Sequence, residues 1–340
     1  SEADLVDGGL RYDLTLPLAR YYANNAAVLP KPFKALQMGS VWRADRPQKG
    51  RFRQFVQCDI DILGEPSNLA EIELILATTT TLGKLGFSGF KVRINERRIL
   101  KAMAVYAGFA EDELDNVYII LDKMDKIGAD GVKEDLIANG FDTDKVEKYM
   151  ALFDGIETAA DGIAYLGETL ADCLDPDVIK SLSEIKESVS STVDTDFEIV
   201  FDPTLVRGMS YYTGTIFEIE MPQFGSSVAG GGRYDRMVGR FTGQDTPACG
   251  FSIGFERIIT ILMDENFQIP DQAQKVAYLV EKGIATEDLC RVIAKAQQER
   301  ANGRQVLVVR MNKNKKFQKQ QLMEEGYEEF EDFYRNPLKM

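Results

Sequence analysis

Apolar and polar residues alternate in the segment FRQFVQCDIDILG near the start of the chain, which follows a first strand-like segment, FKALQMGSVWRAD. From Phe55 onward, Ile60 and Ile62 alternate with Gln57, Asp59 and Asp61. A period of two is typical of antiparallel strands with one buried face. The charged stretch RPQKGR lies between the two segments. The pattern therefore predicts two strands joined by a long, charged hairpin loop.

The periodicity then becomes helical. Leu69, Ile72 and Leu76 have helical spacing, and KVRINE alternates again as a strand. From about residue 97 to 193, helical segments with glycine stops and many acidic residues predict an inserted helical region.

Strand patterns return in DFEIVFDP and TIFEIEM. The glycine-rich SSVAGGGRYD predicts a turn, and GFSIGFERIITIL predicts a small-residue strand entering an apolar helix. Beyond Pro270, strand and helix patterns alternate with continuously apolar strands, which predicts a small α/β unit with parallel pairing. We expect an α+β chain with a core of residues 1–96 and 195–268, a helical insertion of residues 97–194 and an α/β domain of residues 272–340.

The 340 residues contain no histidine. This excludes imidazole general bases, Ser-His-Asp and Cys-His nucleophile systems and histidine-based zinc sites within the sequence. The four cysteines are isolated in sequence, which indicates reduced thiols of a cytoplasmic protein and predicts no metal site. No apolar run is long enough to span a bilayer, so we expect no membrane partner.

The net charge of −14 disfavours indiscriminate binding to nucleic acid, and we expect no DNA partner. The charge is uneven, however. Residues 31–53 contain seven basic residues and one acid, Asp45, and residues 313–319 contain four lysines and no acid. Such basic segments suggest specific anionic partners, and the alternative of a solvated face applies more to the second segment than to the first.

Two clusters in the first part of the chain have residue types suited to ligand binding. Asp13 and Thr15 could capture an ammonium group, but this short pattern alone favours a helix cap. Arginine suits bidentate phosphate binding, and a neighbouring Phe55 ring could stack on a base. A phosphate site is therefore the better interpretation of the arginines flanking the hairpin, which are Arg43, Arg46, Arg51 and Arg53.

Two further clusters lie between the later strands. Arg207 precedes Tyr211 and Tyr212, which indicates either a substrate pocket or a bulge with core aromatics. The glycines of AGGGRYD permit either close approach of a ligand or a tight hairpin. Arg257, one turn into a helix, is a second candidate phosphate ligand.

Taken together and in order, four of these strings resemble the histidyl-tRNA synthetase family of class II aminoacyl-tRNA synthetases. They are LRYDLTLPLARY, RPQKGRFRQFVQCDID, LVRGMSYYTGTIFE and AGGGRYD with GFSIGFERI. The second is similar to class II motif 2, GFSIGFERI to motif 3, and LVRG-x-x-YYTG to a signature of the histidine enzymes. The resemblance implies a class II antiparallel-sheet catalytic core with a helical insertion and a reduced α/β anticodon-binding-like domain.

The resemblance also implies a role for each matched residue. Arg43 would hold the ATP α-phosphate with the substrate carboxylate, Arg207 would lie near that phosphate, and both would be catalytic. Asp45, Arg51, Phe55 and Arg257 would bind ATP. The histidine α-amino group would be bound by Asp13, Thr15 and Gln57. The histidine side chain would be recognised by Asp61, Tyr211, Tyr212 and Tyr234, with Arg207 also near the amino acid.

The implied reaction is ATP-dependent ligation of L-histidine to tRNA(His) through a histidyl-adenylate, with ATP as substrate and Mg²⁺ as its companion ion. A carboxylate that attacks a phosphate is already anionic, so positioning and cationic stabilisation suffice and no protein histidine is needed. A homodimer is expected from the resemblance alone, because nothing upstream of LRYDLT resembles motif 1.

Two other functions remain open. One is a non-catalytic paralogue that acts as the regulatory subunit of ATP phosphoribosyltransferase in histidine biosynthesis. Retention of Arg43, Arg51, Arg207 and Arg257 favours the ligase. The other is a tRNA-sensing or scaffolding module without catalysis, which the short C-terminal region keeps open.

Overall fold

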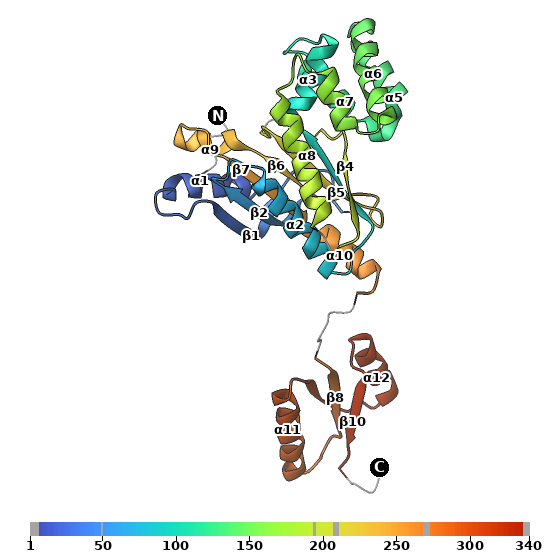
Figure 1. The fold of residues 1–340 in the computed structure, drawn as a ribbon. Coiled ribbons are helices and arrows are strands. Elements are labelled where there is room, and N and C mark those ends of the chain that lie inside the picture. Colours follow the sequence, from blue (N-terminus) through green and yellow to red (C-terminus); the bar gives the residue numbers. More distant parts are fainter. Residues whose placement is uncertain (1–6, 49, 193–194, 207–210, 268–272, 336–340) are drawn as a thin grey trace. The chain divides into compact units, whose positions relative to one another are not determined.

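The computed structural model describes residues 7–48, 50–192, 195–206, 211–267 and 273–335. The chain forms two compact units, residues 1–265 and 266–340. Both units are shown in Figure 1. The helices of the expected insertion belong to the first unit together with the sheet. None of the described helices is long and apolar enough to cross a membrane.

Strand and helix patterns of the sequence correspond to most elements of the structure. The strands are β1 (Phe33–Trp42), β2 (Gln54–Leu63), β3 (Phe90–Glu96), β4 (Phe197–Phe201), β5 (Thr215–Met221), β6 (Ser226–Arg233), β7 (Ala248–Gly254), β8 (Lys275–Val280), β9 (Gln305–Arg310) and β10 (Glu329–Phe333). The helices are α1 (Thr15–Asn25), α2 (Leu69–Lys84), α3 (Arg97–Ala107), α4 (Leu114–Leu121), α5 (Met124–Ala138), α6 (Thr143–Thr158), α7 (Gly162–Thr169), α8 (Pro176–Ser191), α9 (Asp235–Thr242), α10 (Phe255–Asp264), α11 (Thr286–Ala301) and α12 (Lys315–Glu324).

The first unit is built on a seven-stranded sheet in the order β1-β2-β7-β6-β5-β3-β4. All neighbours are antiparallel except β3 and β4, which are parallel. The expectation of an antiparallel sheet therefore needs correction at this one pair. Helices α3 to α8 separate the two strands in sequence, and so long a crossover allows the chain to return in the same direction.

The glycine-rich segment that was expected to be a turn is strand β6, between β5 and β7 near the middle of the sheet. A Cβ at Gly231 would overlap the carbonyl oxygen of Gly250 on β7, and a Cβ at Gly232 would crowd that of Thr215 on β5. Glycine inside a strand permits this close approach of neighbouring backbones. The glycine run therefore serves strand packing, and the turn prediction was wrong.

Helices α2 and α8 lie side by side over the sheet, and the helices of residues 97–169 gather beyond one end of it (Figure 1). One continuous apolar core joins the sheet with these helices, including Ile94, Leu100, Leu136 and Ile185. Local signals set the helix ends. Asp175 caps the start of α8 and Gly108, with φ 99°, ends α3.

A smaller apolar cluster forms beside the sheet. It joins Leu18 and Tyr22 of α1 with Val238 of α9 and Tyr234. Thr15 is the first residue of α1, so Asp13 lies just before the start of a helix. This cluster places the start of α1 against the end of β6.

The second unit has the predicted parallel sheet, in the order β10-β8-β9, with α11 and α12. Strand β10 was missed because its sequence EFEDF is largely acidic and its pattern is weak. Asp332 on β10 accepts ion pairs from Lys315 Nζ at 2.8 Å and Lys319 Nζ at 3.1 Å. Half of the second basic segment is thus paired within its own unit.

Replacing Gly231 with alanine should destabilise the first unit. The new methyl group would meet the Gly250 carbonyl and the Phe217 ring, so the strands must separate. We expect the free energy of unfolding to fall by about 3 kcal/mol, measured by urea denaturation. Gly8→Ala is the control, because a Cβ at Gly8 has nothing within 4 Å. Equal unfolding midpoints for the two variants would contradict this packing role.

Candidate functional site

A cavity of about 470 Å³ opens in the first unit between the β1–β2 hairpin, the start of α1 and strands β2, β6 and β7. It gathers almost all of the residues singled out in the sequence. They are Asp13, Thr15, Arg43, Asp45, Arg51, Phe55, Gln57, Asp61, Tyr211, Tyr212, Tyr234 and Arg257. Arg207 lies outside the described residues. Segments far apart in the sequence thus form one polar site.

Alternation along β2 places Gln57, Asp59 and Asp61 on one face of the strand. Their partners in the register of β7 are small: Gly254, Ser252 and Gly250, respectively. A Cβ at Gly250 would overlap Asp61 Oδ1. Small residues on β7 therefore leave room for the polar side chains of β2 beside the cavity.

Three acceptor atoms of this face are buried and have no hydrogen-bond partner among the described residues. They are Gln57 Oε1, Asp59 Oδ1 and Asp61 Oδ2. The opposite ends of two of these side chains are held, because Tyr234 Oη donates to Asp61 Oδ1 at 2.6 Å and Gln57 Nε2 donates to Ser252 Oγ at 3.3 Å. Buried acceptors without a donor are unfavourable. The face is therefore suited to a ligand that brings N–H donors.

Burial changes the ionisation of the two carboxyl groups. It raises the pKa of Asp59 to about 6, against the lowering effect of a hydrogen bond from Ser252. It also raises the pKa of Asp61 to about 7, against the lowering effect of the hydrogen bond from Tyr234. A cation or strong donor bound beside them would favour their charged forms. The site is thus electrostatically suited to a positively charged ligand.

Asp59 was not among the predicted site residues, although it lines the cavity and is only 3% exposed. A signal was present in the sequence. Asp59 lies two residues from both Gln57 and Asp61, so the alternation that groups those two on one face also includes it. Glu256 was missed as well. Its carboxylate lines the cavity and accepts a hydrogen bond from the Val56 backbone at 2.6 Å.

Arg43 is fixed between two aromatic side chains. Its guanidinium lies 4.4 Å from the Tyr12 ring centroid and 4.9 Å from that of Phe55, and its Nε donates to the Tyr12 carbonyl at 3.3 Å. Such cation–π contacts orient a guanidinium without neutralising it. The predicted phosphate arginine and the predicted stacking ring are therefore neighbours in the cavity wall.

Arg257 holds the tip of the β1–β2 hairpin. Its Nε donates to the Gly50 carbonyl at 3.1 Å, and its Nη1 donates to the Ser227 carbonyl of β6. Gly50 has a φ of 71°, and a Cβ there would overlap the Phe224 ring. On the same hairpin, Asp45 and Arg51 form a loose ion pair at 3.9 Å. Arg257 and Phe224 together dock the hairpin on the β5–β6 turn.

Asp13 has the capping contact that its local pattern favoured. Its Oδ1 accepts a hydrogen bond from the Leu16 backbone at 3.0 Å in the first turn of α1. The side chain also lines the cavity. The cap and a ligand-facing position are therefore compatible.

Arginines on a docked hairpin and on the helix after β7, over a polar cavity in a mainly antiparallel sheet, are features of a class II aminoacyl-tRNA synthetase. The sequence model described as "Histidyl-tRNA synthetase" matches residues 7–258. This chain belongs to the histidyl-tRNA synthetase family.

Individual relatives agree with this assignment. The chain is 45% identical over 319 residues to the histidine–tRNA ligase of Leifsonia xyli, covering 92% of this chain and 72% of the relative. It is 44% identical over 257 residues to that of Aeropyrum pernix, covering 74% and 56%. It also spans 62% of the length of a probable histidine–tRNA ligase of Tropheryma whipplei.

Solved structures show the same fold. A histidyl-tRNA synthetase from Nostoc superposes with a TM-score of 0.76 at 27% identity, over 93% of this chain and 74% of that one. A Bacillus halodurans structure, described as an ATP phosphoribosyltransferase regulatory subunit/histidyl-tRNA synthetase, has a TM-score of 0.73 at 22% identity over 95% and 79%. At that identity, the second similarity concerns the fold alone.

Stability should depend on pH through Asp61. The pKa of Asp61 is about 7 in the native state but about 4 in the unfolded chain. Between these two pH values the native state binds a proton that the unfolded chain has released, so raising the pH destabilises the native state. Between pH 5.5 and 8, we expect Asp61 to account for a decrease of about 2 kcal/mol in the free energy of unfolding. Urea denaturation of Asp61→Asn should lack this part of the decrease. Asp130→Asn, a change at an exposed carboxylate, is the control and should keep the pH dependence of the wild type. If the free energy of unfolding of Asp61→Asn depended on pH as that of the wild type does, the raised pKa of Asp61 would be contradicted.

Removing the Phe224 ring should loosen the hairpin. Without the surface on which Gly50 rests, the loop should become accessible to trypsin at Arg51, and we expect cleavage there to be about tenfold faster. Limited digestion followed by mass spectrometry measures this rate. Phe317→Ala, a change at an exposed ring of the second unit, should leave it unaltered. Equal rates for both variants would show that Phe224 does not hold the loop.

Proposed function

We propose that this chain activates L-histidine with ATP in the cavity described above and transfers the histidyl group to tRNA(His). The observation that carries the proposal is the set of three buried acceptors without donors, Gln57 Oε1, Asp59 Oδ1 and Asp61 Oδ2. Histidine offers matching groups, an α-ammonium with three N–H donors and an imidazole with one or two.

The cavity has two ends suited to these groups. Asp61 and Tyr234 are hydrogen-bonded to each other, and with Tyr211 and Tyr212 they would recognise the imidazole. The α-ammonium would be bound by Asp13, Thr15, Gln57 and, as an addition from the structure, Asp59. Polar groups that are satisfied only by the correct side chain reject apolar amino acids of the same size.

ATP would bind beside the hairpin. Arg43 would hold the α-phosphate and Phe55 would face the adenine, while Asp45, Arg51 and Arg257 would contact the rest of the nucleotide. Mg²⁺ would enter on the ATP phosphates, since proteins usually hold this ion through one or two carboxylates together with the phosphates of the substrate. Arg207 keeps its role near the α-phosphate on the strength of the sequence resemblance.

In the first step, a histidine carboxylate oxygen forms a bond to the α-phosphorus, and the bond from that phosphorus to the pyrophosphate oxygen breaks. The attacking oxygen is already anionic, so the contribution of the protein is orientation and positive charge from Arg43 and Arg207. In the second step, a terminal ribose hydroxyl of tRNA attacks the histidyl carbonyl carbon, and AMP leaves. The basic hairpin is suited to guide the negatively charged RNA end.

Three further features belong to the same proposal. We assign residues 1–96 and 195–268 to the catalytic core, residues 97–194 to an insertion and residues 272–340 to an anticodon-binding-like domain. We also propose a homodimer and a cytoplasmic location. The exposed Leu36 and Met38 on the edge strand β1 are consistent with a subunit interface. Sedimentation of the purified chain would measure the oligomeric state.

Histidine-dependent exchange between ATP and labelled pyrophosphate tests the catalytic proposal. Arg43→Gln should lower the exchange rate at least about 100-fold by removing charge from the α-phosphate subsite. Arg240→Gln removes an exposed arginine of α9 outside the cavity and should remain within about threefold of wild type. Histidine binding without any exchange by the wild type would instead favour the regulatory paralogue.

A further inference from the structure

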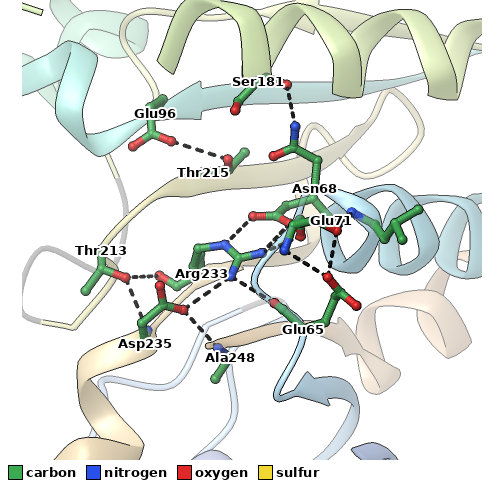
Figure 2. A network of polar contacts seen from close by, with 12 residues as sticks. Glu65, Asn68, Glu71, Glu96, Ser181, Thr213, Thr215, Arg233, Asp235 and Ala248 are labelled. Atoms are coloured by element: carbon green, nitrogen blue, oxygen red, sulfur yellow. Dashed lines mark hydrogen bonds and ion pairs between the residues drawn. The ribbon is translucent and has the colours of Figure 1, made fainter. Parts of the chain in front are cut away.

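Arg233 lies at the end of β6 and is only 8% exposed. Its guanidinium uses all five of its N–H donors, as Figure 2 shows for the surrounding network. Two go to Glu71, at 2.6 Å to Oε1 and 2.7 Å to Oε2. The others go to Asp235 Oδ1 at 3.4 Å and to the carbonyls of Ser67 at 3.0 Å and Glu65 at 3.3 Å. The side chain is therefore held in a single orientation.

Glu71 is the counterpart of this arginine. It lies in the first turn of α2, where the helix dipole favours a negative charge, and it is 1% exposed. Glu65 and Ser67 belong to the connection between β2 and α2, so two consecutive parts of the chain after Asp61, this connection and the first turn of α2, meet the same guanidinium. The pair therefore fixes the end of β2 and the start of α2 relative to β6.

The same arginine adjoins two of the three tyrosines of the predicted imidazole end, Tyr212 and Tyr234. Tyr234 follows it directly, and the Arg233 carbonyl accepts a hydrogen bond from the Thr213 backbone at 2.7 Å, next to Tyr212. Asp235, which contacts Arg233, also accepts from the Ala248 backbone at 2.9 Å. The positions of both rings thus depend on where Arg233 is held.

We propose that the Arg233–Glu71 ion pair is a positioning element for the imidazole end of the cavity. It fixes the distance between Asp61, which precedes the anchored connection, and Tyr234, which follows the arginine. Neither Arg233 nor Glu71 lines the cavity, so the pair acts through Tyr234 and Tyr212. This inference rests on the proposed function and specifies how the affinity for histidine is set.

Glu71→Gln is the informative substitution, because glutamine has the same shape but lacks the charge and one acceptor. The guanidinium should move towards Asp235, which would turn the adjoining Tyr234 away from Asp61. We expect the Kd for histidine, measured by titration calorimetry, to rise about tenfold. The Kd for ATP should change by less than about twofold, because the nucleotide residues lie on the hairpin, at the start of β2 and on α10, outside the segments that the pair anchors.

Glu96→Gln is a matched control. Glu96 is also 1% exposed and also binds an arginine through both oxygens, with Arg98 Nε and Nη2 each at 3.0 Å. It contacts Thr215 in the same region of the first unit but does not line the cavity (Figure 2). This variant should lose less stability than Glu71→Gln, since the Arg98 side chain is about half exposed to water whereas that of Arg233 is buried. Its Kd for histidine should remain that of the wild type.

The outcomes separate the two proposals. Histidine binding that is equal in folded Glu71→Gln and Glu96→Gln would overturn the positioning role while leaving the proposed function intact. A wild-type chain that binds no histidine would overturn the proposed function and this inference with it. If Glu71→Gln does not fold, Asp235→Asn can replace it, because this change weakens the same network more mildly. We expect the Kd for histidine of Asp235→Asn to rise about threefold. An unchanged Kd for histidine in that variant would overturn the inference.

Discussion

The buried ion pair between Arg233 and Glu71 is the constraint around which the first unit is arranged. A guanidinium removed from water is stable only if its charge is balanced and its donors are satisfied, and here all five donors have acceptors. Meeting that requirement brings together the end of β6, the β2–α2 connection and the first turn of α2. Lysine could not replace the arginine, since it lacks the planar fork that binds both carboxylate oxygens.

The cavity depends on this rigidity because it contains groups that oppose folding. Buried acceptors without donors and carboxyl groups with raised pKa values lower the stability of the unit. They persist because the strand register holds the surrounding sheet in place. Glycines such as Gly250, which has no side chain, also leave space for Asp61. Stability lost at the site is offset by packing in the core that extends from the sheet into the helices.

Much of this arrangement could be predicted from the sequence, but only where the signal is local or belongs to a recognisable motif. Alternation in β2 predicted its strand and the face that Gln57, Asp59 and Asp61 share, and the resemblance to the family implied the roles of Gln57 and Asp61. The glycines of β6 were misread because their cause, the carbonyl oxygens of Gly250 and Thr215, comes from distant segments. Strand β10 was missed because its acidic sequence is not typical of a strand. Its Asp332 is paired with Lys315 and Lys319, which come close to it only in the folded unit. The partnership of Arg233 with Glu71 likewise spans 162 positions and has no periodic pattern.

The absence of histidine from these 340 residues has a physical consequence at the site. An imidazole of the protein near Asp59 or Asp61 would donate to the free carboxylate oxygens and satisfy them internally, as Tyr234 does for one oxygen of Asp61. The described neighbours of the cavity leave these acceptors to a ligand instead. A ligand that brings both an ammonium and an imidazole would pair them, restore the charge of both carboxyl groups and recover the free energy that their burial costs. Affinity for such a ligand then follows from the same unsatisfied groups that destabilise the protein without a ligand. This requires that Arg233 hold Tyr234 within hydrogen-bond distance of Asp61.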